Sequence, residues 1–102
     1  MHKLIALYKT PPNPAHFREH YENVHIPLLA KLPGVVKMNY SFDIKGADGG
    51  EPFFCIFEAY FEKAEDLNAA MQTPEGGAVV ADLGNYEQGE YWIFNYPVIE
   101  AK

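Results

Sequence analysis

The sequence predicts an α+β domain of the ferredoxin-like kind, with the order βαββαβ and one antiparallel sheet. Three observations lead to this prediction. Four stretches have strand character, helical patterns lie between the first and second and between the third and fourth, and only a glycine-rich turn separates the middle two. A chain of 102 residues is long enough for one modest core, so we expect residues 1–102 to form a single domain.

The first strand and helix are marked by clear boundary residues. Residues 3–9 form a short apolar run that ends at the proline-rich turn 10–14, which is typical of a buried strand. Asn13 is a plausible N-cap with Pro14 in the first helical position, and Pro33–Gly34 should end the helix. The expected inward stripe consists of residues three and four apart: Phe17, Tyr21, Val24, Leu28 and Leu32.

The two middle strands differ in pattern. Residues 35–44 alternate strictly between apolar and mainly polar side chains, which indicates a strand with one buried face. Residues 46–50 form the turn. Residues 53–61 are largely apolar on both faces, so both faces of this strand should be covered.

The last third of the chain should contain a short helix, a second helix and a strand. Leu67, Ala70 and Met71 mark the short helix, and Thr73-Pro74-Glu75 is a typical cap and first turn of the next. Residues 90–98 form the last strand, with Trp92, Phe94 and Tyr96 on one face.

Helices cover only one face of such a sheet, so aromatic side chains on the other face would be exposed to water. A large exposed aromatic patch is unusual on a soluble monomer. We therefore expect a homodimer in which two sheets pack together as an α+β barrel with a shared, aromatic-lined interior.

Composition narrows the possible partners. The net charge of −6 argues against nucleic acid and against an anionic membrane, because both require a basic surface. The single Cys55 fits a reducing compartment, no apolar run approaches the length of a membrane span, and we expect a cytoplasmic protein. An apolar content of 48% excludes a disordered chain.

The histidines of the first helix are candidates for chemistry. His16 and His20 lie four residues apart, a spacing that can bind a metal, but no acidic residue of this helix completes the site, so we expect no metal. His20 and His25 border the apolar stripe, and either could act as a general acid or base. The alternative is that each histidine binds a backbone carbonyl that Pro27 leaves free.

Other candidates lie on the strands. Glu58 is the one carboxylate within the most apolar strand, and burial there would raise its pKa and make it a possible acid or base; otherwise it pairs with Lys37 or Lys45, or faces solvent. The expected ligand-binding hydroxyls are those of Tyr8, Tyr21, Tyr40 and Tyr60, although most such tyrosines serve only in cores or interfaces.

The chain also resembles a known family, the EthD family. The resemblance rests on Leu4–Tyr8, on Phe17-x-x-His20-Tyr21-x-x-x-His25-x-Pro27-Leu28, on Leu32-Pro33-Gly34, on residues 70–76 and on the last strand. It implies a dimeric α+β barrel, an accessory role in the oxidative degradation of an ether, and a classification that leans towards oxidoreductase. Some similar domains act as cofactor-free dehydratases or decarboxylases, and the matching histidines are His20 and His25.

These observations leave several functions open. The first is an accessory protein of catabolism that binds a small apolar or aromatic molecule in the barrel. The alternative is an enzyme that needs no cofactor, either a dehydratase, decarboxylase or isomerase that uses His20 or His25 as general acid or base, or a small monooxygenase that reacts its substrate directly with oxygen.

Overall fold

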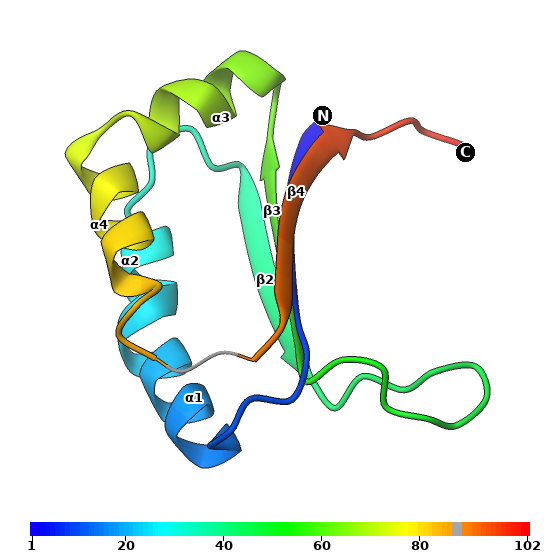
Figure 1. Ribbon diagram of the computed structural model, residues 1–102. Coiled ribbons are helices and arrows are strands. Elements are labelled where there is room, and N and C mark those ends of the chain that lie inside the picture. The colour runs from blue at the N-terminus through cyan, green and yellow to red at the C-terminus, as the bar shows by residue number, and fades with distance from the viewer. Residues whose placement is uncertain (87–88) are drawn as a thin grey trace.

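The computed structural model describes residues 1–86 and 89–102. Its elements follow the order β1 (His2–Tyr8), α1 (Pro14–His20), a π-helical turn η1 (Tyr21–His25), α2 (Ile26–Leu29), β2 (Lys37–Phe42), β3 (Cys55–Phe61), α3 (Ala64–Met71), α4 (Pro74–Asp82) and β4 (Tyr91–Pro97). The four strands form one antiparallel sheet in the order β2-β3-β1-β4. All helices lie on one face of this sheet, which confirms the predicted ferredoxin-like α+β fold (Figure 1).

The strands alternate as the pattern predicts. On β3, Cys55, Phe57, Ala59 and Phe61 are buried beneath the helices, while the three residues between them are only partly covered. The register places the partly covered residues beside the aromatic face of β4, because Ile5 pairs with both Glu58 and Phe94. One face of the sheet therefore packs on the helices, and the other face, called the open face below, is covered by none of the helices of residues 1–86 and 89–102 (Figure 1).

Caps and glycines set the path of the helices. The side chain of Asn13 accepts a hydrogen bond from the His16 amide, and that of Thr73 accepts one from the Gly76 amide, so both predicted N-caps are confirmed. A Cβ at Gly76 would lie 2.6 Å from the carbonyl oxygen of Ala70, which leaves room only for glycine where α4 begins against the end of α3.

The first helical region differs from the sequence prediction. The expected single helix up to Pro33–Gly34 is divided by η1, and α2 ends at Leu29. The expected inward stripe holds for Phe17, Tyr21 and Leu32, which are buried. It fails at Val24, which is 38% exposed, because the widened turn places His25 and Leu29 on the inward side instead.

Candidate functional site

The π-helical turn is the local feature that builds the site. The amide of Ile26 donates to the carbonyl of Tyr21, five residues earlier, so this turn contains one residue more than an α-helical turn. Pro27 follows directly; it has no amide hydrogen, and its ring would clash with the carbonyl four residues before it in a regular helix. Residues five apart come to one face in such a turn, which places His20 and His25 side by side.

Both histidines bind the same carboxylate, that of Asp82 at the end of α4. His20 Nε2 lies 2.9 Å from Oδ1 and 3.1 Å from Oδ2, and His25 Nδ1 lies 2.9 Å from Oδ2. Asn85 is the third donor, with a hydrogen bond of 3.0 Å to Oδ1. An ionised carboxylate only accepts hydrogen bonds, so His25 carries its proton on Nδ1 and, when neutral, has a free electron pair on Nε2.

Burial sets the charge of this cluster. Desolvation lowers the pKa of His25, which is 2% exposed, and the hydrogen bond to Asp82 opposes that effect only in part. At Asp82, burial acts to raise the pKa, but the hydrogen bonds from Asn85, His20 and His25 together hold it below its usual value. Near neutral pH the arrangement is therefore an ionised Asp82 that orients a neutral His25.

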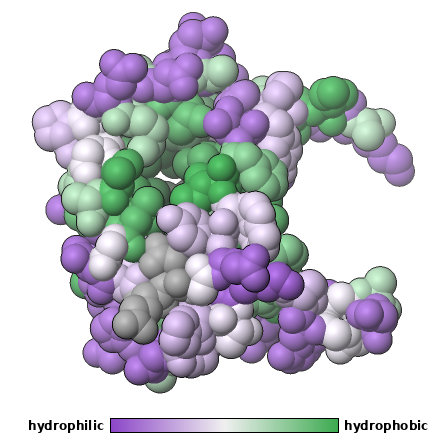
Figure 2. Space-filling model, in the orientation of Figure 1, coloured by the Kyte–Doolittle hydropathy of each residue, from purple (hydrophilic) through white to green (hydrophobic). Residues whose placement is uncertain are grey.

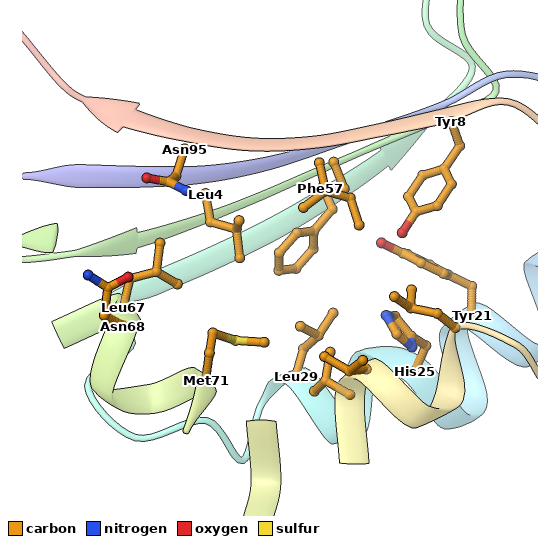
Figure 3. A pocket seen from close by; sticks show the side chains of 15 residues that line it. Leu4, Tyr8, Tyr21, His25, Leu29, Phe57, Leu67, Asn68, Met71 and Asn95 are labelled. Atoms are coloured by element: carbon orange, nitrogen blue, oxygen red, sulfur yellow. The ribbon is translucent and has the colours of Figure 1, made fainter. Parts of the chain in front are cut away.

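A cavity of about 260 Å³ lies between the helices and the sheet, beside His25. Its wall is mostly apolar, with contributions from β1, β3, β4 and all the helical segments except α1 (Figure 3). The surface view shows an opening between α4 and β4 with hydrophobic side chains on both sides (Figure 2). The lining residues are Leu4, Ala6, Tyr8, Tyr21, His25, Leu29, Phe57, Leu67, Asn68, Met71, Val79, Val80, Leu83, Ile93 and Asn95.

Two tyrosine hydroxyls lie near His25 at the inner end of this cavity (Figure 3). The side chain of Tyr21 is fully buried, and its hydroxyl makes no hydrogen bond of normal geometry within the part of the chain that the structure describes. Tyr8 is 3.3 Å, oxygen to oxygen, from Tyr86, whose ring stacks on His20. Burial raises the pKa of Tyr8 and raises that of Tyr21 further, so both hydroxyls stay protonated.

The structure brings together three of the residues that the sequence singles out. Tyr8, Tyr21 and His25 line the cavity. His20 does not line it but shares the carboxylate of Asp82. Tyr40 donates to Glu22 and stands behind Tyr21 rather than at the cavity wall.

Glu58 and Tyr60 lie on the open face, on the opposite side of the sheet from His25. Glu58 forms an ion pair of 2.7 Å with Lys3 of β1 and accepts a weak hydrogen bond of 3.4 Å from Tyr60. Its partner is thus neither Lys37 nor Lys45. Lys45 pairs instead with Glu51. Glu58 and His25 therefore do not face the same cavity. A catalytic role for Glu58 would need a second, separate site on the open face.

Two further findings concern metal ligands and membrane-spanning helices. Among residues 1–86 and 89–102, no group of three or more His, Cys, Asp or Glu side chains is arranged to bind a metal. His16 is exposed, with its ring centre 6.2 Å from that of His20. Within the same ranges, none of the helices is long and apolar enough to span a bilayer.

The sequence reasoning missed Asp82, Tyr86 and Asn95. Asp82 is the last residue of α4, three residues after the buried Val79 and directly before Leu83, so an acidic residue within this largely apolar stretch was the available signal. Nothing local to Tyr86 shows that it meets the histidines, because these contacts join residues more than 60 positions apart.

The comparisons with known proteins agree with the fold and show the family. The model of the EthD domain matches residues 9–88. A Rhodococcus erythropolis protein, described as an uncharacterized 11.0 kDa protein in the thcB-thcC intergenic region, is 32% identical over 90 residues, which cover 87% of this chain and 86% of that protein.

Solved structures show the same fold. An ethyl tert-butyl ether d (EthD) family protein from Bacillus halodurans C-125 is 33% identical, with a TM-score of 0.88 over 97% of this chain and 99% of the other. A dimeric protein of unknown function with a ferredoxin-like fold from Bacteroides fragilis is 17% identical, with a TM-score of 0.69 over 95% of each chain. The match of the family model and the two relatives above 30% identity lead to one conclusion: this chain belongs to the EthD family.

Proposed function

We propose that this protein is an acid-base enzyme that binds a small, largely apolar carbonyl compound in its cavity and moves a proton on it, with His25 as the general base. The observation that carries the proposal is the Asp82–His25 pair at the wall of an apolar cavity. A neutral imidazole whose second nitrogen is oriented by a carboxylate has the features of a general base that works near neutral pH.

The surrounding groups fit the charges that such a reaction creates. His25 Nε2 would remove a proton from the carbon next to the carbonyl group, and the resulting imidazolium would be stabilised by Asp82, 2.9 Å away. The electron pair of the broken C–H bond would move to the carbonyl oxygen. The Tyr21 hydroxyl is protonated and makes no hydrogen bond of normal geometry among the described residues, so it is available to donate to that oxygen. His25 would then return the proton to another carbon or to a leaving hydroxyl group, giving isomerisation or loss of water.

The size and polarity of the cavity limit the substrate. A volume of about 260 Å³ lies below the roughly 300 Å³ at which sites for drug-sized ligands begin. The substrate is thus comparable to a single substituted ring. The apolar walls would exclude water from the reacting atoms, which strengthens each electrostatic interaction of the site.

The cavity alone would serve an accessory protein equally well, and the sequence favours that function. The geometry shifts the preference, because simple binding of an apolar molecule does not require a histidine with a buried carboxylate partner. A buried carboxylate lowers stability unless hydrogen-bond donors surround it. Three donors converge on Asp82, so the chain maintains this charge beside His25, which binding alone would not need. An accessory role in oxidative degradation is therefore the second candidate.

Hydrogen-deuterium exchange on a ketone tests the proposal. Acetophenone in deuterated buffer should incorporate deuterium into its methyl group faster with the protein than without it, as followed by proton NMR. The variant His25→Gln should lose about 10²- to 10⁴-fold of this acceleration. His16→Gln, on the exposed side of the same helical region, is the matched control and should leave the rate unchanged. Binding of acetophenone without any acceleration would refute catalysis and support the accessory role.

We also propose that the chain forms a homodimer through the open face. Ile5, Leu7 and Ile56 lie on this face, and β4 adds Trp92 and Phe94, which are 41% and 44% exposed. An apolar surface of this kind on a folded domain is typical of a protein interface. The relative from Bacteroides fragilis is described as dimeric. The helix-side cavity would remain separate in each protomer, so the interior between the two sheets would not be the ligand site.

A further inference from the structure

The cavity has two polar ends, of which the catalytic proposal uses one. Tyr8, Tyr21 and His25 lie at the inner end, and Asn68 and Asn95 lie at the opposite end, with apolar side chains between them (Figure 3). Both asparagines are exposed and belong to facing elements, α3 and β4, so they form part of the rim rather than the floor.

Asn95 is held in one orientation by a buried partner. His2 Nε2 lies 2.7 Å from Asn95 Oδ1, and His2 itself is only 9% exposed. An amide oxygen can only accept, so the His2 ring donates and the carboxamide oxygen is occupied. The amide nitrogen lies on the side of the cavity while the oxygen is turned away from it (Figure 3). Within the described residues this nitrogen has no hydrogen-bond acceptor.

The charge of the wall indicates what this amide would bind. None of the described residues that line the cavity is lysine or arginine. A carboxylate at this rim would therefore lose part of its hydration without gaining a cation, which is costly, whereas a neutral oxygen needs only a donor. The Asn95 amide provides that donor at the end of the cavity away from His25.

We propose that Asn95, oriented by His2, is a specificity residue that binds a second, neutral acceptor oxygen of the substrate at the mouth of the cavity. The substrate class is then a small carbonyl compound with an apolar middle and a second carbonyl or ether oxygen at the far end. This inference rests on the proposed function only in placing the first carbonyl group at Tyr21 and His25. The contact at Asn95 does not depend on that function.

Two ketones of nearly equal size separate the contact at Asn95 from the binding of the first carbonyl group. The probe para-diacetylbenzene carries the second oxygen, and para-isopropylacetophenone replaces that acetyl group by an isopropyl group of similar size. The protein should bind the diketone about fivefold to tenfold more tightly, the value of one neutral hydrogen bond. The carboxylate para-acetylbenzoate should bind more weakly than the diketone. Dissociation constants from NMR titration give these ratios.

Variants of Asn95 provide the decisive comparison. Asn95→Leu removes the donor, and Asn95→Asp keeps the shape but offers only acceptors, so both should reduce the preference for the diketone to about one. His2→Phe should reduce it as well, because the amide is then free to turn. Asn23→Leu, an exposed asparagine of η1, is the matched control and should keep the full preference.

The outcomes distinguish this inference from the proposed function. Equal affinity for the two ketones, no affinity for either, or an unchanged preference in Asn95→Leu overturns the role of Asn95. A clear preference for the diketone without any exchange of deuterium into its methyl groups refutes the acid-base function and leaves the specificity contact intact. The preference also separates the contact from a purely structural role, which would change affinity for both ketones alike.

Discussion

Replacing Asp82 by asparagine tests the central interaction of the site with almost no change in shape. The two carboxylate oxygens accept from His20, His25 and Asn85. An asparagine would turn one of these acceptors into a donor, so at least one of the three donors would face an N–H group. A hydrogen bond to a charged group contributes about 1.5–3 kcal/mol, and one lost bond plus the loss of charge at the others gives about 2–3 kcal/mol of destabilisation. For a domain of about 100 residues this lowers Tm by roughly 8–24 °C.

The same substitution should change the tautomer of His25. An amide N–H of the new asparagine would favour a lone pair on His25 Nδ1 and move the proton to Nε2, which would then donate into the cavity instead of accepting a proton. We expect exchange of the acetophenone methyl protons to fall about 10²- to 10⁴-fold. Nitrogen NMR of the imidazole rings reports the tautomer, and circular dichroism at one fixed protein concentration reports Tm.

Glu19→Gln is the control for the lost charge, because Glu19 is exposed on α1 next to His20. It should leave Tm, the tautomer and the exchange rate unchanged. If Asp82→Asn folds with an unchanged Tm and keeps the proton on His25 Nδ1, then the carboxylate does not orient the imidazole, and the assignment of His25 as an oriented base is wrong.

Three other perturbations follow from the same geometry. Tyr21→Phe removes a buried hydroxyl that makes no hydrogen bond of normal geometry in the described chain. We expect unchanged stability or a gain of up to about 1 kcal/mol in chemical denaturation, together with an exchange rate about 100-fold lower. A loss of stability would show that the hydroxyl is bonded in the free protein. Burial lowers the pKa of His25 below its ordinary 6.5, so the folded state binds fewer protons than the unfolded state below that pH. The free energy of unfolding should therefore fall as pH drops below about 6.5. It should fall again below about 3.8, because the pKa of Asp82 is also lowered and this carboxylate becomes protonated on unfolding. His25→Gln should remove the first of these two slopes in urea titrations at a series of pH values, and an unchanged slope would place the titration elsewhere. Phe94→Lys puts a charge on the open face and should give a monomer mass near 11.5 kDa in sedimentation, against twice that mass for the unaltered chain. A variant that remains dimeric would show that another surface forms the interface.

The fold could be predicted because its signals are local. Alternation in residues 35–44, the cap at Asn13 and the cap at Thr73 each depend on neighbours within four positions, and the structure contains all three features. The ends of the elements shift by one to a few residues, since fraying and turns decide them.

The π-helical turn could not be predicted from a pattern of period 3.6. Pro27 indicated that the helix departs from regular geometry, but a proline allows a kink, a break or a widened turn. The widened turn exchanges Val24 for His25 on the inward side, and this exchange decides which histidine enters the core.

The pairing of the histidines with Asp82 is also non-local. It depends on how α4 packs against the first helical region, 57 to 62 residues away. Histidine types and spacing suggested an acid-base site, whereas the carboxylate that orients His25 became visible only in the folded chain. The same holds for Glu58, whose apolar neighbours suggested a buried acid although its side of the sheet is the open face.

Three features that cost stability meet at this one cavity. Pro27 removes a helical hydrogen bond, Asp82 is a buried charge, and the Tyr21 hydroxyl is buried without a good hydrogen bond in the described chain. The cavity adds to them, because its mostly apolar wall does not pack against other side chains of the domain. Local features that lower stability concentrate at functional sites. At other positions, a substitution that removes such a feature makes the protein more stable without loss of function. Their convergence around His25 therefore supports a site kept for a ligand, and it implies that a ligand which fills the cavity and bonds to Tyr21 will stabilise the domain.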